Sequence, residues 1–97
     1  MSKLDTSKYY VEEAMQEGLK LFERKNHDYD NSFFDEQDNL DAYMNIKRKF
    51  ARIDAMFKKN EKLMVDETIE DTLLDLGNYC FMTIAKMRMQ KDETRDN

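Results

Sequence analysis

The sequence contains no proline, and its only glycines are Gly18 and Gly77. Proline breaks helices, glycine weakens them, and both residues are common in the turns that connect strands. A chain of 97 residues with so few of them is expected to be almost entirely helical. Its length allows one domain at most, which we place over residues 1–97.

Apolar residues recur at helical spacing in three stretches, so we predict three main helices near residues 7–25, 39–59 and 66–89. The three apolar series are Val11, Met15, Leu19 and Phe22; Tyr43, Ile46, Phe50, Ile53 and Phe57; and Ile69, Leu73, Leu76, Cys80 and Ile84. The core should therefore lie within about residues 7–89, and the polar tail 90–97 is expected to be disordered.

Local signals mark where these helices begin and where they come close to one another. The expected N-caps, whose side chains accept hydrogen bonds from the first turn, are Thr6 or Ser7, Asp38 or Asn39, and Asp66. Gly18 lies in the middle of the first helix, where glycine costs about 1 kcal/mol relative to alanine. We therefore expect another helix to approach closely at Gly18.

Three long helices from so short a chain leave apolar residues on more than one face. On the third helix, Leu74 and Phe81 lie opposite Leu73 and Leu76. A second copy of the chain would cover the surplus face, and symmetric dimers are the commonest such assembly. We therefore predict an all-α helical bundle of three main helices, completed by oligomerisation and most simply a homodimer.

The third helix also carries a polar stripe. At 3.6 residues per turn, four polar residues fall on one side of it: Glu67, Asp71, Asp75 and Asn78. Leu74 and Phe81 border this stripe, so we expect it to be half-buried. Stacked carboxylates repel one another unless a cation or basic side chains lie between them. The stripe is therefore interpreted either as a binding site or, more simply, as a solvated acidic face.

The segment Lys25–Phe34 interrupts the helical period. Its asparagine, aspartate and serine side chains favour local hydrogen bonds to the backbone over helix. Tyr29, Phe33 and Phe34 are nevertheless too apolar for a free linker. We expect a structured loop, which either holds a ligand or is a turn fixed by its aromatic residues. His27, the single histidine, is interpreted as a loop residue.

The polar side of the second helix is basic, and it carries Lys47, Arg48, Lys49 and Arg52. Residues three or four positions apart share a helix face, so these cations form one patch. The patch is either solvated, or some of its members meet the acidic stripe or a phosphate.

The charge and composition exclude several classes of function. A net charge of −5 argues against general nucleic-acid binding, because phosphate contacts dominate that affinity, but it permits a local basic pocket. The lone Cys80 has no partner for an intrachain disulfide and is interpreted as a reduced structural thiol. No apolar run reaches membrane-spanning length and no signal-peptide core is present, so we expect a cytoplasmic protein.

Three segments of the chain match one pattern in order. They are Lys-Asn-His-Asp-Tyr-Asp-Asn-Ser-Phe at 25–33, Lys-Phe-Ala-Arg at 49–52 and Glu-Thr-Ile-Glu-Asp-Thr-Leu-Leu-Asp-Leu-Gly-Asn-Tyr at 67–79. Together they resemble the nucleotide modification associated domain 1 family. The resemblance covers about residues 10–88. Asp30 stands where the family usually has glycine, a residue that permits positive φ, and aspartate tolerates the same conformation. Members are common in phages, so the resemblance implies a phage or mobile-element origin.

More remotely, the family resembles the all-α nucleoside triphosphate pyrophosphatases of the MazG type, which are magnesium-dependent helical dimers or tetramers. Their last core helix carries Glu and Asp one turn apart, at the positions of Glu67 and Asp71. The preceding helix in that family usually supplies a further cluster of glutamates, whereas here it offers Lys49 and Arg52. The resemblance therefore implies a nucleotide-binding protein with pyrophosphohydrolase-like activity.

That chemistry assigns roles to particular residues. Magnesium binds about six oxygens, usually from one or two carboxylates, water and substrate phosphates. Its predicted ligands are Glu67, Asp71 and Asp28, with Asp75 as a less favoured third carboxylate; Glu70 or Glu67 is the catalytic base, and Asp71 completes the catalytic set. The substrate-binding residues are Lys25, Lys49 and Arg52 for phosphate, Tyr29 or Phe33 for stacking, and Asp28 and Asn78 beside them.

A second reading needs no catalysis. Lys49 and Arg52 would pair with Glu67 and Asp71, and these salt bridges would close the site. The chain would then be an acidic helical interaction protein, such as a phage factor that binds a host protein.

Overall fold

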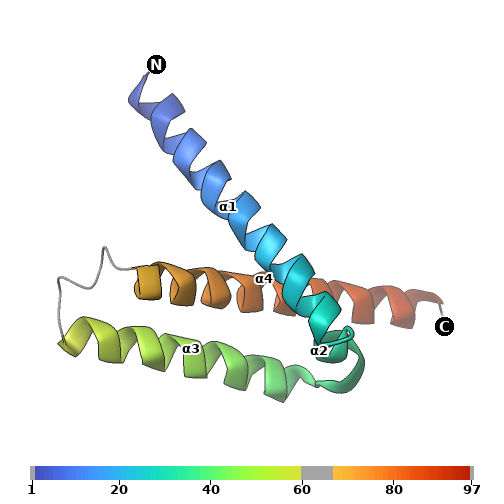
Figure 1. Ribbon diagram of the computed structural model, residues 1–97. Coiled ribbons are helices and arrows are strands. Elements are labelled where there is room, and N and C mark those ends of the chain that lie inside the picture. Colours follow the sequence, from blue (N-terminus) through green and yellow to red (C-terminus); the bar gives the residue numbers. More distant parts are fainter. Residues whose placement is uncertain (1, 60–66, 97) are drawn as a thin grey trace.

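The computed structural model describes residues 2–59 and 67–96. Within these ranges the chain forms no strand, and its helices are α1 (Lys3–Asp28), α2 (Ser32–Glu36), α3 (Asn39–Lys59) and α4 (Glu67–Asp96) (Figure 1). The predicted all-α class is confirmed, and α3 has the predicted bounds. It starts at Asn39 because Asp38 and Asp41 each accept a hydrogen bond from the other's backbone N–H, at 2.8 and 3.0 Å, a reciprocal capping arrangement.

The first helix is longer than predicted at its N-terminus. It begins at Lys3 rather than near residue 7. Its cap is Ser2, in place of the expected Thr6 or Ser7, because the Ser2 hydroxyl accepts a hydrogen bond from the backbone N–H of Asp5 at 3.1 Å. The expected cap of the last helix, Asp66, lies outside the described residues.

The last helix is longer than predicted at its C-terminus. It continues to Asp96, so the expected disordered tail over residues 90–97 is helical as far as Asp96. The tail contains no glycine or proline, and straight-chain polar residues such as Gln, Lys, Glu and Arg are good helix formers. Polarity alone therefore did not distinguish a solvated helix from a disordered segment.

The segment predicted as a structured loop is a loop only in part. Residues 29–31 form a turn in which Asp30 and Asn31 have φ values of 53° and 60°. Aspartate and asparagine tolerate this left-handed backbone, as expected at the position where the family pattern has glycine. The chain then forms the short helix α2 over Ser32–Glu36, and the predicted loop, which ended at Phe34, included the first three residues of this helix.

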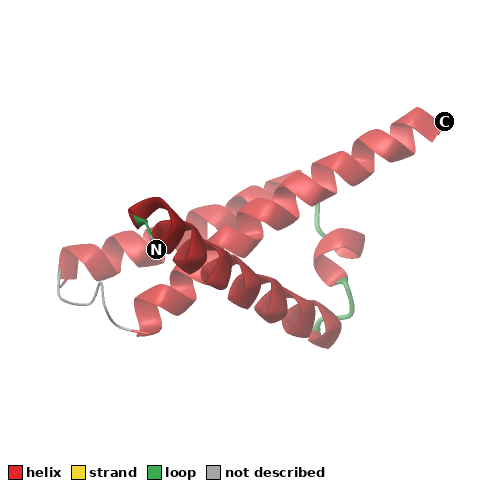
Figure 2. Cartoon of the chain, turned by 90° about the horizontal axis from the view of Figure 1, so that it is seen from above, coloured by secondary structure: helices red, strands yellow, loops and turns green. Residues whose placement is uncertain are grey.

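The helices α3 and α4 lie side by side and antiparallel, and α1 crosses α4 at an angle (Figures 1 and 2). Gly18 is buried at this crossing, and the side-chain amide of Asn78 donates to its carbonyl oxygen at 3.0 Å. A Cβ added at Gly18 would lie 3.3 Å from Asn78 Oδ1. The expected close helix contact at Gly18 is thus present.

Few apolar side chains in the described part of the chain are buried, namely Phe33, Ala42, Ile53 and Ile69. The predicted core face of α1 is not among them, since Val11, Met15 and Leu19 are 58%, 57% and 49% exposed. The N-terminal half of α1 stands clear of the other helices (Figure 1). Within a single chain the prediction is wrong for these three residues, whereas Phe22, the fourth residue of the predicted face, is half-buried.

None of the described helices combines the length and the apolar character that a bilayer-spanning segment requires.

Candidate functional site

A cavity of about 280 Å³ opens where the end of α1, the turn, α2, α3 and α4 meet; it is called here the polar cavity, because charged and amide side chains form part of its otherwise apolar lining. The residues that line it are Phe22, Lys25, Asn26, Tyr29, Ser32, Phe33, Gln37, Asn45, Arg48, Asp75, Asn78, Tyr79 and Met82. The set combines cations, amides and aromatic rings with a single carboxylate. It can therefore contact a ligand that has both an anionic group and a planar polar group.

Asp75 is the electrostatic centre of this cavity. Its Oδ1 accepts a hydrogen bond from Lys25 Nζ at 2.8 Å, and its Oδ2 accepts one from Lys49 Nζ at 3.3 Å. The side chains of Lys49 and Asp75 are only 17% and 18% exposed, whereas Lys25 is 48% exposed. These contacts join α1 and α3 to the N-terminal third of α4.

The lysines control the ionisation of Asp75. Burial raises the pKa of this carboxyl, but the hydrogen bonds and charges of Lys25, and then of Lys49, lower it by more, so that its pKa lies below the ordinary 3.8. Asp75 is therefore ionised at neutral pH and balances one of the two ammonium groups. Arg48 also lines the cavity, which leaves a local excess of positive charge in a chain whose net charge is −5.

Lys86 holds in place the segment of α2 that carries Phe33, one of the aromatic residues lining the cavity. Only 6% of Lys86 is exposed, and its ammonium donates to the carbonyl oxygens of Phe33 and Phe34 at 3.0 and 3.3 Å. It also lies 5.4 Å from the centroid of the Phe33 ring, within cation–π range. A lysine from α4 thus satisfies carbonyls of α2 that so short a helix leaves without intrahelical partners.

A comparison with protein families points to the same part of the chain. The sequence model of nucleotide modification associated domain 1 matches residues 25–87. The chain belongs to this family. No curated protein and no solved structure matches the chain. The remoter similarity to MazG-type pyrophosphatases is not shown by these comparisons and stays a prediction.

The family segment contains every residue that lines the polar cavity except Phe22. The cavity is therefore built almost entirely by the nucleotide modification associated domain. Four of the predicted substrate-binding residues line it, namely Lys25, Tyr29, Phe33 and Asn78. A fifth, Lys49, contacts the cavity through its ion pair with Asp75.

The structure places a different pair of charges together from the one expected. Lys49 meets Asp75, one helical turn beyond the predicted Asp71. The side chain of Asp71 is exposed and forms no ion pair with the described residues, and the same holds for Arg52. Arg48 lines the cavity, whereas Arg52, which was predicted to bind phosphate, does not. The half-buried part of the polar stripe is thus its C-terminal half, at Asp75 and Asn78.

In the described part of the chain, the predicted metal ligands do not come together into one site. The side chains of Asp28 and Asp71, and that of the predicted base Glu70, are exposed. Among the described residues, no group of three or more His, Cys, Asp or Glu side chains could hold a metal ion. The side chain of Glu67 lies outside the described set, so its predicted roles as ligand and base stay predictions.

The sequence analysis assigned no role in binding to Gln37 or Asn45, and it considered Arg48 only as one member of the basic patch that could meet a phosphate. All three residues line the cavity. Arg48 belonged to the basic patch and could have been selected with Lys49, since the two are neighbours in sequence. Gln37 and Asn45 carried no signal, because isolated amides are common on the polar faces of helices.

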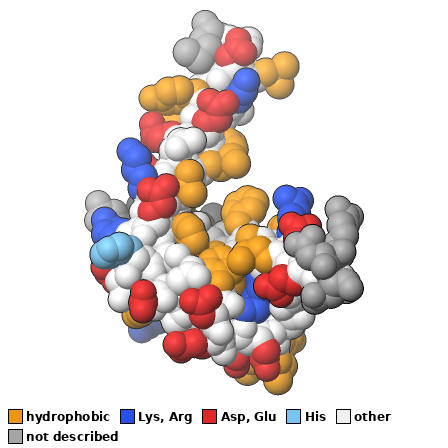
Figure 3. Space-filling model, turned by 90° about the vertical axis from the view of Figure 1, so that its right-hand side faces the viewer, with side chains coloured by type: hydrophobic (Ala, Val, Ile, Leu, Met, Phe, Trp, Pro, Cys, Tyr) orange, Lys and Arg blue, Asp and Glu red, His pale blue; other side chains and the backbone are white. Residues whose placement is uncertain are grey.

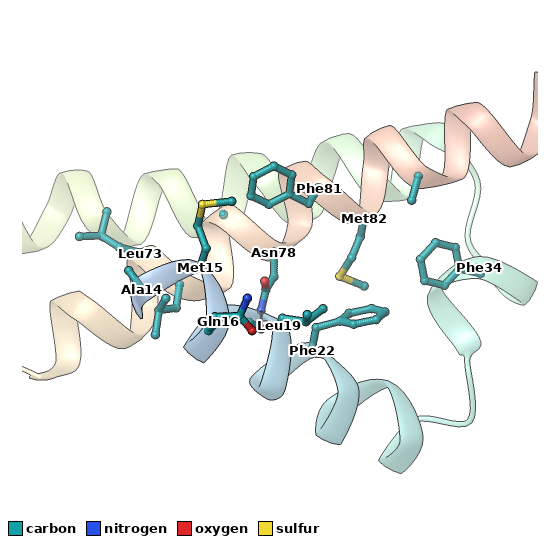
Figure 4. Close-up of a pocket in the computed structure, with 14 residues that line it drawn as sticks. Ala14, Met15, Gln16, Leu19, Phe22, Phe34, Leu73, Asn78, Phe81 and Met82 are labelled. Atoms are coloured by element: carbon teal, nitrogen blue, oxygen red, sulfur yellow. Dashed lines mark hydrogen bonds between the residues drawn. The ribbon is translucent and has the colours of Figure 1, made fainter. Parts of the chain in front are cut away.

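A second hollow, here called the α1/α4 groove, has a volume of about 470 Å³ and is almost wholly apolar. Figure 3 shows hydrophobic side chains gathered where α1 rises from the rest of the molecule. The groove shares Phe22, Asn78 and Met82 with the polar cavity. In Figure 4, Met82 reaches from α4 toward Phe22 on α1, so these side chains form a wall between the two hollows.

Proposed function

We propose that the polar cavity binds a nucleotide. The observation that carries this proposal is the pairing of Lys25 and Lys49 with a single half-buried carboxylate, Asp75, at a cavity that Arg48 also lines. Three cations and one carboxylate leave a net positive charge that attracts an anion. Charge-assisted hydrogen bonds to phosphate are among the stronger polar contacts in proteins. The aromatic and amide side chains beside them suit a base.

The exposed cations are the ones that would reach the phosphates. Lys25 and Arg48 are exposed at the cavity, whereas Lys49 is held largely inside by Asp75. Lys25 can leave Asp75 for a phosphate while Lys49 keeps the carboxylate paired. Binding of this kind should weaken as salt is added, because exposed charges are screened.

The pyrophosphohydrolase activity and the magnesium ion implied by the resemblance are further proposals, which depend on Glu67, Glu70 and Asp71. The described carboxylates alone do not form a magnesium site. The geometry therefore supports nucleotide binding better than it supports hydrolysis.

Two arginines of α3 provide a matched test of binding. Arg48 and Arg52 are both exposed, lie one turn apart and form no ion pair with described residues, but only Arg48 lines the cavity. Arg48→Met should weaken the binding of nucleoside triphosphates about tenfold, the loss of one or two charge-assisted contacts. Arg52→Met should change it less than twofold, as measured by calorimetry.

Equal losses in the two arginine variants would contradict the placement of the phosphates beside Arg48. If the wild-type protein binds no nucleotide, with or without magnesium, the result would favour the alternative interpretation of the sequence. The chain would then be a non-catalytic interaction protein, and pull-downs from host lysate with charge reversals on its acidic surface would be the next experiment.

We also propose that a second copy of the chain covers the α1/α4 groove. Its large apolar side chains are exposed, with Phe81 at 61%, Met15 at 57% and Leu73 at 48%. The small residues Ala14, Gly77 and Ala85 also line it, and nothing lies within 4 Å of a Cβ added at Gly77. A helix can therefore approach the groove closely.

The protruding half of α1 has the shape and chemistry to fill that groove in a partner. Its apolar face is uncovered in the single chain, and two-fold symmetry would place each α1 in the groove of the other copy. A stable interface of this kind buries about 800 Å² per partner. The single chain buries few apolar side chains, so a second copy would supply the missing core.

A further inference from the structure

Two side chains in the polar cavity form a hydrogen-bonded amide pair. Asn45 Nδ2, on α3, donates to Gln37 Oε1, at the C-terminal end of α2, at 2.8 Å. Both side chains are half-buried and both line the cavity. No other protein group in the described chain bonds to them. The amide pair therefore keeps hydrogen-bonding capacity that the fold does not use.

The unused capacity is of a defined kind. An amide offers an acceptor oxygen and a donor NH₂ group. Because one donor and one acceptor are used between Gln37 and Asn45, one amide oxygen and one NH₂ group of this cavity-lining pair make no hydrogen bond to the described residues. This holds for either orientation of the two amides, since reversing both only exchanges which residue donates. The pair thus presents a neighbouring donor and acceptor in both cases.

An unpaired nucleobase has the complementary edge. Each base carries hydrogen-bond donors and acceptors side by side, and asparagine and glutamine recognise such edges in pairs of bonds. A cavity of about 280 Å³ is close to the lower limit of ligand cavities, roughly 300 Å³, so it suits a base or nucleoside rather than a whole triphosphate. Tyr29, at 68% exposure, lies at its rim with a ring free to stack.

We infer that the Gln37–Asn45 amide pair reads the base of the bound nucleotide, with the base inside the cavity and the phosphates outside, toward Lys25 and Arg48. This inference rests on the proposed nucleotide binding and adds which end of the ligand enters and what sets its specificity. It assigns a mononucleotide as the ligand class, because a cavity of about 280 Å³ has room for a single base or nucleoside.

The test compares ligands with and without a base. The wild-type protein is titrated calorimetrically with the four common ribonucleoside 5′-monophosphates, with ribose 5-phosphate and with inorganic tripolyphosphate. At least one monophosphate should bind about tenfold or more tightly than ribose 5-phosphate, the gain from two neutral hydrogen bonds. This comparison uses the unaltered protein, so it stands even if a variant fails to fold.

The variant Gln37→Met/Asn45→Leu removes both amides and keeps their shape. It should lose the preference for the base, while its affinity for tripolyphosphate changes less than twofold. The chain offers a matched control, since Asn39 and Gln90 form a second amide pair, at 3.3 to 3.5 Å, outside the cavity. Gln90→Met/Asn39→Leu should leave the base preference unchanged.

The outcomes separate the two proposals. If the wild type binds tripolyphosphate and ribose 5-phosphate as tightly as every monophosphate, the role of the amide pair is overturned and phosphate binding stands. The same conclusion follows if the cavity variant keeps the preference for the base. If the wild type binds none of these ligands, nucleotide binding itself is overturned, and the inference is overturned with it.

Discussion

Lys86 Nζ donates to the carbonyl oxygen of Phe33 at 3.0 Å, although the two residues are 53 positions apart in the sequence. The contact joins the C-terminal half of α4 to the short helix α2, which forms one wall of the polar cavity. Lys86→Met keeps the length of the side chain but leaves the Phe33 and Phe34 carbonyls unpaired. We expect the free energy of unfolding to fall by about 1–3 kcal/mol, as measured by urea denaturation.

The matched control for this change is Lys91→Met, an exposed lysine on the same helix with no partner among the described residues. Its effect should stay within about 0.5 kcal/mol. If the two variants are equally stable, Lys86 does not hold α2 in place. Nucleotide binding by Lys86→Met should also weaken, because the Phe33 wall moves.

Asp75→Asn should reduce stability at neutral pH by about 1–3 kcal/mol, because Lys25 and Lys49 lose a charged acceptor. The pKa of Asp75 is lowered in the fold, so the carboxylate contributes stability that is fully present above its ordinary pKa of 3.8 and is lost as the pH falls through the lower folded value. The difference between the wild type and Asp75→Asn should therefore be constant near pH 6 and shrink below about pH 3.8.

Asp71→Asn is the control for this pH dependence, since Asp71 lies one turn away on α4 and is exposed. Its unfolding curves should follow those of the wild type at every pH. A difference between wild type and Asp75→Asn that does not change down to pH 2 would show that the ion pairs contribute nothing measurable.

The proposed second copy predicts that polar substitutions in the α1/α4 groove dissociate the assembly. Met15→Gln and Phe81→Gln should lower the molar mass measured by light scattering at tens of micromolar toward that of one chain. Met44→Gln is the control, because Met44 is also exposed, at 50%, but lies on α3 outside the groove. A monomer mass for the wild type at this concentration would rule out the assembly.

Hydrolysis can be tested separately from binding. If the protein is a pyrophosphohydrolase, nucleoside triphosphates should release pyrophosphate only when magnesium or manganese is present. Asp71→Asn keeps the shape and removes one charge, so metal affinity and rate should fall together. Full activity of Asp71→Asn would contradict the assignment of Asp71 as a metal ligand. Release of orthophosphate alone would contradict the proposed cleavage that yields pyrophosphate.

Much of the local structure follows from the sequence alone. The apolar periods and the absence of proline determined the three long helices, and the bounds of α3 agree with the prediction. The hydrogen-bonding side chains of residues 29–31 determined a turn, and a position suited to glycine carries Asp30 with positive φ. These features depend on residues within one or two turns of each other, where spacing and backbone preference decide the outcome.

The tertiary structure alone decided which charges meet. Helix α4 presents an acid on successive turns, at Asp71 and Asp75, and α3 presents cations on successive turns, so the sequence permits several pairings of equal chemistry. The position at which α1 crosses α4, at Gly18 and Asn78, covers the turn that holds Asp75 and leaves Asp71 in solvent. Helical periodicity fixes the face on which a side chain lies but not the point along the axis where another helix packs, and only that point selects the partners of Lys25 and Lys49.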